Sequence, residues 1–188
     1  MELLSVQIKQ FTKEAHQTLE GVVVRQLKAI REEKDYALLL GKFYGFFQPV
    51  EKAFVKFFNE TNIPYYHQRR RSSIILDDLR HLNASAGDLP IATNLPAIDN
   101  EHRALGAFYV LEGSSQGGPI IASMLIKQSG MPADSVNFFN AYKEDEKKKW
   151  QSFRERLDEI PAGSDEAKEI LKAANETFEK FHLWMVNK

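Results

Sequence analysis

The stretch LEGSSQGGPIIASML, residues 111–125, places three glycines and a proline inside a segment that otherwise has the pattern of a helix. In a helix interior each glycine costs about 1 kcal/mol relative to alanine, and a proline about 3 kcal/mol. Because glycine has no Cβ, Gly113 and Gly117 clear one helix face down to the backbone, and Gly118 extends the clearing. Close packing of two helices is the simpler explanation, but alanine would serve it at lower cost. We therefore expect a kinked helix with a planar ligand against its backbone.

The composition indicates one soluble globular domain spanning residues 1–188. Hydrophobic residues make up 43% of the chain and charged residues 27%, which is ordinary for such a domain. The formal net charge of -1 does not favour nucleic acid as a partner. The absence of cysteine excludes thiolate nucleophiles, disulfides and cysteine-ligated zinc. We find no signal peptide and no apolar run near the ~20 residues of a membrane span, so we expect a cytoplasmic protein without a membrane partner.

Helical periodicity dominates the chain, and no strand-like alternation of any length interrupts it. The predicted fold class is therefore all-α, a single-domain bundle of several helices. The basic run HQRRR, residues 67–71, is predicted to be the solvated flank of a loop. The expected helices cover residues 4–22, residues 35–60 with Asp35 as N-cap and a kink at Pro49, residues 72–85 capped by Ser72 or Ser73, a long helix from Asp99 through the glycines, residues 143–160, and a last helix capped by Ser164.

One of the five histidines, His16, adjoins the apolar stripe of an expected helix, so its side chain should look obliquely into the core. A single histidine in such a place is usually a hydrogen-bonded core residue, and the alternative is an axial ligand of a planar cofactor. If that cofactor were heme, His16 would be the base on one face and the glycine-rich helix the wall on the other. The remaining histidines lie among charged or loop residues and are expected at the surface; they are His67, His81, His102 and His182.

Two motifs resemble those of the heme oxygenase family. FTKEAHQTLE, residues 11–20, is similar to the family's proximal-helix motif, and YVLEGSSQGGPII, residues 109–121, is similar to the distal-helix motif in its bacterial form. The order and separation of the motifs agree, and FRERLDEI (153–160) and AANETFEKF (173–181) resemble the family's closing helices. The resemblance covers nearly the whole chain. It implies a bundle that holds heme between a proximal helix and a kinked, glycine-rich distal helix.

The resemblance also implies roles for individual residues. His16 matches the proximal histidine that ligates the heme iron, and Glu20 matches a carboxylate near it. Gly113 and Gly117 match the distal glycines whose backbone lies over the heme, and Gly118 matches the flexible second glycine of the pair. Three further positions match groups whose places vary between branches of the family: Lys9 and Arg154 as cations for the heme propionates, and Phe178 as a pocket aromatic.

The distal motif departs from the family pattern at three positions. Ser114 stands where animal-type members carry an aspartate that organises the water network for proton delivery. We expect Ser114 to act in catalysis with Gly113 and Gly117 by holding distal waters. Gln116 is larger and more polar than expected, and Pro119 directly after the glycines is unusual.

The activity that the resemblance implies is oxidative cleavage of heme, which is both substrate and cofactor, to biliverdin, carbon monoxide and ferrous iron. The reaction would use O2 and electrons from a reductase or a ferredoxin. Two alternatives stay open: a non-catalytic heme carrier of the same fold, and a helical interaction module with an apolar groove. A carrier would bind hemin through His16 without degrading it, and an interaction module would not bind it.

Overall fold

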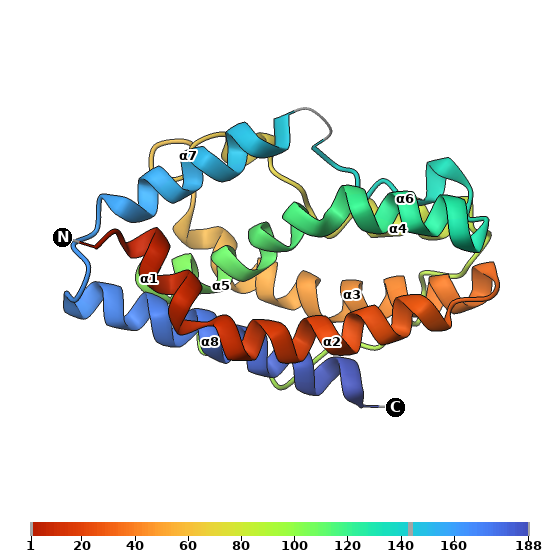
Figure 1. Ribbon diagram of the computed structural model, residues 1–188, viewed down its shortest axis with the longest axis horizontal. Coiled ribbons are helices and arrows are strands. Elements are labelled where there is room, and N and C mark those ends of the chain that lie inside the picture. Colours follow the sequence, from red (N-terminus) through yellow and green to blue (C-terminus); the bar gives the residue numbers. More distant parts are fainter. Residues whose placement is uncertain (1, 143–144, 188) are drawn as a thin grey trace.

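The computed structural model describes residues 2–142 and 145–187, and every regular element within them is a helix (Figure 1). The predicted all-α fold is therefore confirmed. The α-helices are α1 (Leu4–Phe11), α2 (Lys13–Ala29), α3 (Glu33–Phe54), α4 (Ile74–His81), α5 (Glu101–Gly113), α6 (Gly118–Ser129), α7 (Glu146–Asp158) and α8 (Asp165–Val186). Short 3-10 segments lie between them: η1 (Val55–Phe57), η2 (Tyr66–Gln68), η3 (Ser114–Gly117) and η4 (Ala133–Ser135).

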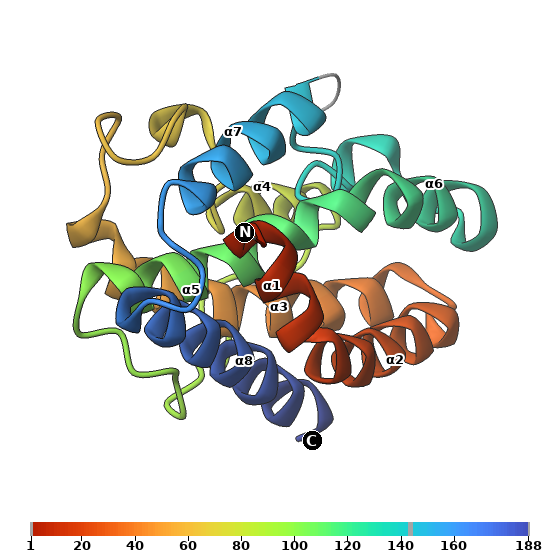
Figure 2. The same cartoon turned by 60° about the vertical axis from the view of Figure 1, so that its left-hand side comes forward.

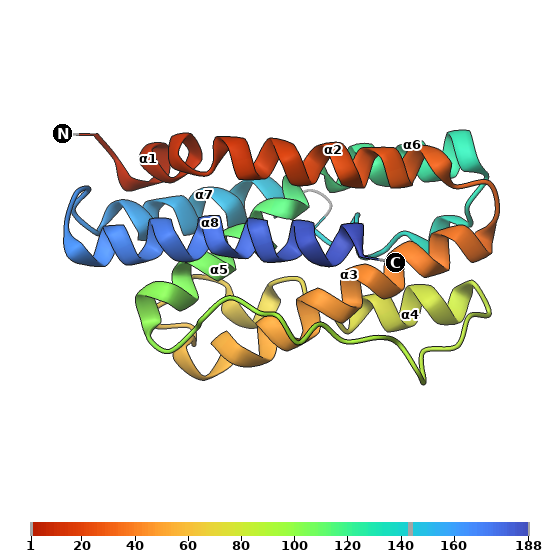
Figure 3. The ribbon, with the colours of Figure 1, turned by 90° about the horizontal axis from the view of Figure 1, so that it is seen from below.

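Helix α8 is the central element of the bundle. It packs against both α5 and α2, and Figure 3 shows α2 running beside it and α5 passing behind it. Gly106 allows the close approach of α5, because a Cβ there would overlap the Ile170 carbonyl of α8. Helix α1 lies across one end, between α7 and α8 (Figure 2). Among the described residues no helix is long and apolar enough to cross a membrane.

Aromatic side chains fill the middle of the core. Phe181 of α8 packs against the α3 rings, with centroids 4.7 Å from Phe46 and 5.4 Å from Phe43. Phe47 of α3 continues the cluster to Phe138, at 5.6 Å. All five rings are buried, so α3, α8 and the segment after α6 share one apolar core.

Pro49 lies inside α3, yet the helix continues through it as one element. Proline has no backbone N–H, so the carbonyl four residues earlier loses its helical donor. Here that carbonyl belongs to Gly45, and it accepts a hydrogen bond of 2.9 Å from the Ala92 backbone N–H. Gly45 has no side chain, and a Cβ there would overlap the Pro90 carbonyl. The loop between α4 and α5 thus supplies the bond that Pro49 removes.

The predicted continuous helix over residues 4–22 is wrong, because the chain breaks between α1 and α2 at Thr12. The Thr12 hydroxyl donates to the Ile8 carbonyl at 2.8 Å, a back-bonding arrangement that bends helices. Its φ and ψ are -90° and 1°. The break also changes the apolar face of the predicted helix, since Phe11 beside it is 52% exposed.

The predicted start of α3 is also wrong. Helix α3 begins at Glu33, and the Asp35 carboxylate instead accepts the Arg31 and Glu32 backbone N–H groups from the third helical position. Helix α4 starts after Ser73, one of the two predicted caps, but the Ser73 side chain makes no cap hydrogen bond. The Ser72 hydroxyl donates to Glu51 Oε2 at 2.6 Å. The predicted helix over 35–60 ends as α-helix at Phe54 and continues as η1.

Other predicted boundaries agree with the structure. Ser164 caps α8 by accepting the Ala167 N–H at 3.1 Å, and acidic residues fill the first turn as expected. The helix predicted to start near Asp99 is capped by Asn100, which accepts the Arg103 N–H at 2.9 Å. Helix α7 begins at Glu146 within the predicted segment 143–160, whose residues 143–144 lie outside the described part of the chain.

Candidate functional site

The glycine-rich turn, residues 113–118, joins α5 to α6. Helix α5 ends at Gly113, η3 spans the turn, and α6 starts at Gly118. Pro119 is therefore in the first turn of a new helix, where its missing N–H costs nothing. The predicted kink thus takes the form of a 3-10 turn, and the glycines and the proline stand at helix ends instead of in a helix interior.

The three glycines of the turn have three different surroundings. A Cβ on Gly113 would come within 3.3 Å of Trp150 Cη2, so the flat group against this backbone is an indole of the chain itself. A Cβ on Gly118 would overlap the Phe139 carbonyl. No described atom lies within 4 Å of the position that a Gly117 Cβ would take. The expectation that all three glycines clear one face for a ligand is therefore wrong, and in residues 2–142 and 145–187 only Gly117 of the three has open backbone.

His16 lies in the first turns of α2 and is exposed, contrary to the expectation that it looks into the core. Its ring meets the edge of Phe178 of α8, with centroids 5.3 Å apart and planes at 86°. Within the described residues neither ring nitrogen has a hydrogen-bond partner. Glu20, one turn later, is exposed as well. The imidazole is thus an accessible base backed by an aromatic ring.

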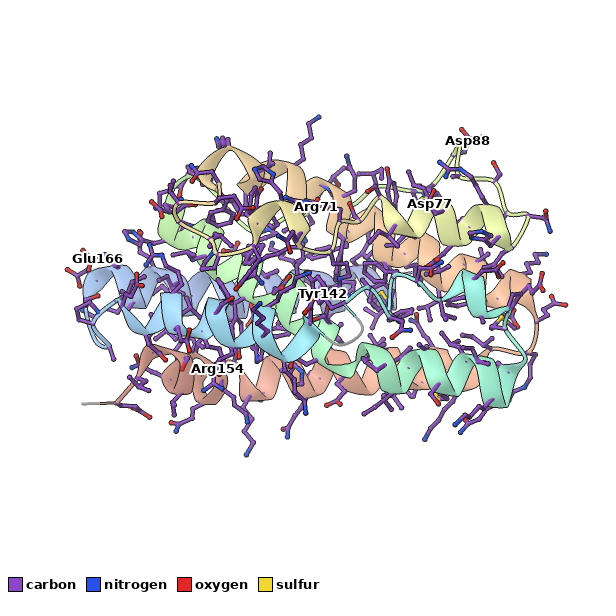
Figure 4. All side chains as sticks on the ribbon, turned by 90° about the horizontal axis from the view of Figure 1, so that it is seen from above. Arg71, Asp77, Asp88, Tyr142, Arg154 and Glu166 are labelled. Atoms are coloured by element: carbon purple, nitrogen blue, oxygen red, sulfur yellow. The ribbon has the colours of Figure 1, made fainter. Side chains whose placement is uncertain are left out.

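The helix that carries His16 faces the glycine-rich turn across the molecule. In Figure 1, α5 and α6 pass above α2, and the view from above in Figure 4 shows α6 lying lengthwise in front of one half of α2. Along α8, Phe178 and Phe181 connect His16 to the aromatic core described above. We call the rings of Phe43, Phe47, Phe138, Phe178 and Phe181 the aromatic wall. These rings are buried and form an apolar core that begins beside His16 at Phe178.

The remaining residues expected at the site differ in their surroundings. Lys9 is exposed near the end of α1, while Arg154 of α7 is partly buried. Burial raises the pKa of Tyr109 of α5 and outweighs its hydrogen bond with Thr12 and the charge of Arg154, which both favour the ionised phenol. The Tyr109 ring also packs against Trp150 at 5.5 Å. Tyr109 and Trp150 were not singled out from the sequence, although Tyr109 stands one turn before Gly113 on the same helix face.

The prediction that residues 67–71 form a solvated flank is wrong. Arg69 is 3% exposed, and its Nη1 lies 2.5 Å from Oε1 of buried Glu112 on α5. Its Nη2 donates to the Lys149 carbonyl of α7 at 3.1 Å. The second Glu112 oxygen accepts the Tyr142 hydroxyl at 2.8 Å, and burial together with the Glu112 charge raises the pKa of Tyr142. The loop arginine therefore joins α5 to α7 through a buried ion pair.

Arg70 and Arg71 are also bonded inside the protein. Arg70 Nη2 donates to the Leu111 carbonyl at 2.6 Å and to Ser114 Oγ at 2.5 Å. The Ser114 hydroxyl donates in turn to the Leu111 carbonyl at 2.7 Å. Arg71 pairs with Glu51 of α3 at 3.4 Å, and Figure 4 shows it beside α3 while Tyr142 lies near the α5–α6 junction. Ser114, predicted to hold distal waters, is thus committed to protein partners.

In residues 2–142 and 145–187 no group of three or more His, Asp or Glu side chains is placed to hold a metal ion. The described residues instead offer the His16 imidazole, buried aromatic rings behind it and open backbone at Gly117. Such a set suits a planar ligand that brings its own metal.

Comparison with known proteins gives the same family throughout. A family model described as heme oxygenase matches residues 2–187. A curated heme oxygenase of Xanthomonas campestris pv. campestris (strain 8004) is 30% identical over 117 residues, which are 62% of this chain and 68% of that protein.

Solved structures share the fold over almost the whole chain. Heme oxygenase-1 of the cyanobacterium Synechocystis sp. PCC6803, in complex with heme, superposes with a TM-score of 0.79 at 22% identity, covering 98% of this chain and 91% of that one. The heme oxygenase of Leptospira interrogans gives a TM-score of 0.79 at 20% identity, with 98% of both chains covered. The NO- and CO-bound enzyme of Neisseria meningitidis gives 0.76 at 16% identity, covering 98% and 91%.

Proposed function

The chain belongs to the heme oxygenase family, and from this premise we propose that it cleaves heme oxidatively to biliverdin, carbon monoxide and ferrous iron. The reaction takes O2 and electrons from a reductase or a ferredoxin. When bound, heme supplies the redox and oxygen chemistry, and the protein supplies binding, orientation and protection from solvent.

The observation that carries the proposal is the unpartnered imidazole of His16 on a helix that faces the open backbone at Gly117. Heme requires an axial base on one face, and an exposed imidazole with both nitrogens free fits that need. On the other face the plane needs room to approach the protein, and Gly117 presents backbone with no side chain in the way. The aromatic wall suits the apolar edge of a porphyrin. The residues present therefore fit the group.

Each residue of the proposed site would have a defined task. His16 would hold the iron, and Phe178 would restrain the tilt of the imidazole through the edge contact. Gly117 would let the backbone approach the bound heme closely. Arg154 and Lys9 would compensate the propionate charges, and Glu20 would orient His16 through water.

Aromatic side chains near α7 keep bulk water out of the proposed heme site. Trp150 packs directly on Gly113 and against Tyr109, which closes the side of the turn toward α7. Excluding water strengthens the electrostatic interactions within a site and suppresses side reactions. We propose that Gly113 contributes to this exclusion of water, because its lack of a side chain lets the Trp150 indole pack against the backbone.

The first test is a titration of the purified protein with hemin, followed at the Soret band, for the wild type, His16→Ala and the control His67→Ala. His67 is exposed, and its ring packs on Tyr66, away from Phe178. We expect wild type and control to form a histidine-ligated complex and His16→Ala to lose it, with partial recovery in added imidazole.

The second step adds ascorbate or a reductase under oxygen. Loss of the Soret band with growth of biliverdin absorption supports the oxygenase. Hemin that binds through His16 and survives reduction intact identifies a heme carrier instead. Equal hemin spectra for wild type and His16→Ala contradict the assignment of the axial ligand.

A further inference from the structure

The glycine-rich turn is held at its start by an arginine from a distant loop. Arg70 reaches the last turn of α5 and donates to both the Leu111 carbonyl and Ser114 Oγ. The Ser114 hydroxyl has one proton, and it is donated to the same carbonyl. Ser114 therefore acts toward Arg70 as an acceptor, and the two side chains bind the end of α5 together.

Arg70 is itself fixed in place. Its guanidinium lies over the Phe138 ring at 4.3 Å, and its backbone N–H donates to the Tyr142 hydroxyl at 2.5 Å. Tyr142 is bound by Glu112, which is paired with Arg69. These contacts hold the Arg70 side chain in one position. Its hydrogen bonds to the neutral groups at the end of α5 are also charge-assisted, which makes them stronger than bonds between neutral groups.

The far end of the turn is held by the same segment that lies under Arg70. The residue after Phe138 is Phe139, whose carbonyl lies against Gly118 so closely that no Cβ fits. The turn is thus fixed at Ser114 by Arg70 and at Gly118 by Phe139. Gly117 lies between these two points and is the glycine with open backbone.

We propose that Arg70 is a positioning residue for heme. Its hydrogen bonds to Ser114 and to the Leu111 carbonyl, which we call the latch, hold the start of the glycine-rich turn. They thereby fix the distance between the Gly117 backbone and the bound heme. The inference rests on the proposed function for the identity of the ligand. The latch itself rests only on contacts within the chain. Without it, the 3-10 turn is free to shift relative to α2, and the bound plane loses its fixed distal neighbour.

The test compares Arg70→Met with Arg71→Met, a neighbouring arginine bonded to Glu51 of α3 and away from the turn. In the ligand-free proteins we expect amide hydrogen exchange in residues 113–118 to become about tenfold faster in Arg70→Met and to be unchanged in Arg71→Met. With hemin, we expect Arg70→Met to bind about tenfold more weakly with an unchanged Soret position. Ser114→Ala should give a smaller effect in the same direction, and combining it with Arg70→Met should add little.

Both the hydrogen-exchange measurement and the hemin titration have a result that would contradict the proposed role of Arg70. Unchanged exchange at the turn in Arg70→Met shows that other contacts hold it. Faster exchange with unaltered hemin affinity shows that the latch does not position the ligand. If the wild type binds no hemin, the proposed function fails, while the exchange arm still decides whether Arg70 holds the turn. Should Arg70→Met fail to fold, Arg70→Lys and Ser114→Ala carry the same comparison.

Discussion

Gly117 and Gly118 are neighbours in the sequence that lack a side chain for opposite reasons. Gly118 lies against the Phe139 carbonyl, so its reason is packing within the protein. Gly117 has φ and ψ of -89° and -9°, which any L-residue adopts, and it has space for a Cβ. No contact among the described residues requires glycine at this position, so we attribute Gly117 to the ligand.

This difference predicts opposite outcomes for two adjacent alanine substitutions. Gly118→Ala should lower the free energy of unfolding by about 2–3 kcal/mol, because the Phe139 backbone cannot yield easily. Gly117→Ala should leave it unchanged or raise it by up to about 1 kcal/mol, yet weaken hemin binding. Urea unfolding and Soret titration of both variants measure the two effects. If Gly117→Ala binds hemin as the wild type does, its open backbone does not face the ligand.

At the scale of single residues the sequence predicted some neighbours and missed others for a physical reason. The family resemblance placed His16 and Phe178 at one site, and the structure brings the two rings together, while their roles toward heme stay predictions. The internal hydrogen bonds of Arg69 and Arg70 were missed because their partners are distant in sequence. Arg69 pairs with Glu112, 43 positions away, and Arg70 binds Ser114, 44 positions away. A local charge pattern contains no information about such partners, and three adjacent arginines in a loop usually face water.

At the scale of elements, one carboxylate holds the segment after α6 against α4. Asp78 of α4 is fully buried and accepts hydrogen bonds from the Phe138 N–H at 2.8 Å and from Asn137. These bonds favour the ionised form and so lower the pKa, but burial outweighs them and raises the pKa of Asp78 to about 6. Because Phe138 and Phe139 support the glycine-rich turn, Asp78 connects α4 to the candidate site.

The raised pKa predicts a stability change between about pH 4 and pH 6. In that window the folded protein holds a proton on Asp78 that the unfolded chain has lost, so the free energy of unfolding falls as the pH rises. Across this pH window, the contribution of Asp78 to the free energy of unfolding should fall by about 1–3 kcal/mol. We would measure the difference in unfolding free energy between wild type and Asp78→Asn at pH 4.5 and pH 7, since it isolates this group from other carboxylates.

Asp77→Asn is the matched control, because the Asp77 side chain is 56% exposed on the same helix. The difference in unfolding free energy between the wild type and Asp77→Asn should not decrease as the pH rises. A difference for Asp78→Asn that grows toward pH 7 would mean that the ionised carboxylate stabilises the fold, with its hydrogen bonds outweighing the cost of burial.

The elements themselves were predictable where periodicity and capping are local. The helical character of the chain, the Ser164 cap and the start of α5 followed from nearby residues. The break at Thr12 did not, because it depends on the Thr12 hydroxyl donating a hydrogen bond to the Ile8 carbonyl. The uninterrupted course of α3 through Pro49 depends on Ala92, a residue 43 positions later in the chain.

At the scale of the whole molecule, the two faces of the proposed site belong to parts of the bundle held by different contacts. Helix α2 packs on α8, while α6 starts at Gly118, which lies against the Phe139 carbonyl. A ligand bound between them adds contacts to both parts. It should therefore stabilise the fold as a whole, and more strongly if it is ligated by His16.

Hemin should raise the melting temperature of the wild type. Free hemin at 100 times its Kd adds about 2.7 kcal/mol, which corresponds to about 5–10 °C for a chain of this size. Metal-free protoporphyrin has the same plane but no iron for His16 to bind, so its shift should be smaller. In His16→Ala the two porphyrins should give nearly equal shifts, because only the aromatic wall and the Gly117 backbone then contribute. Differential scanning calorimetry of the four combinations measures this, and a hemin shift that survives intact in His16→Ala would place the iron ligand elsewhere in the chain.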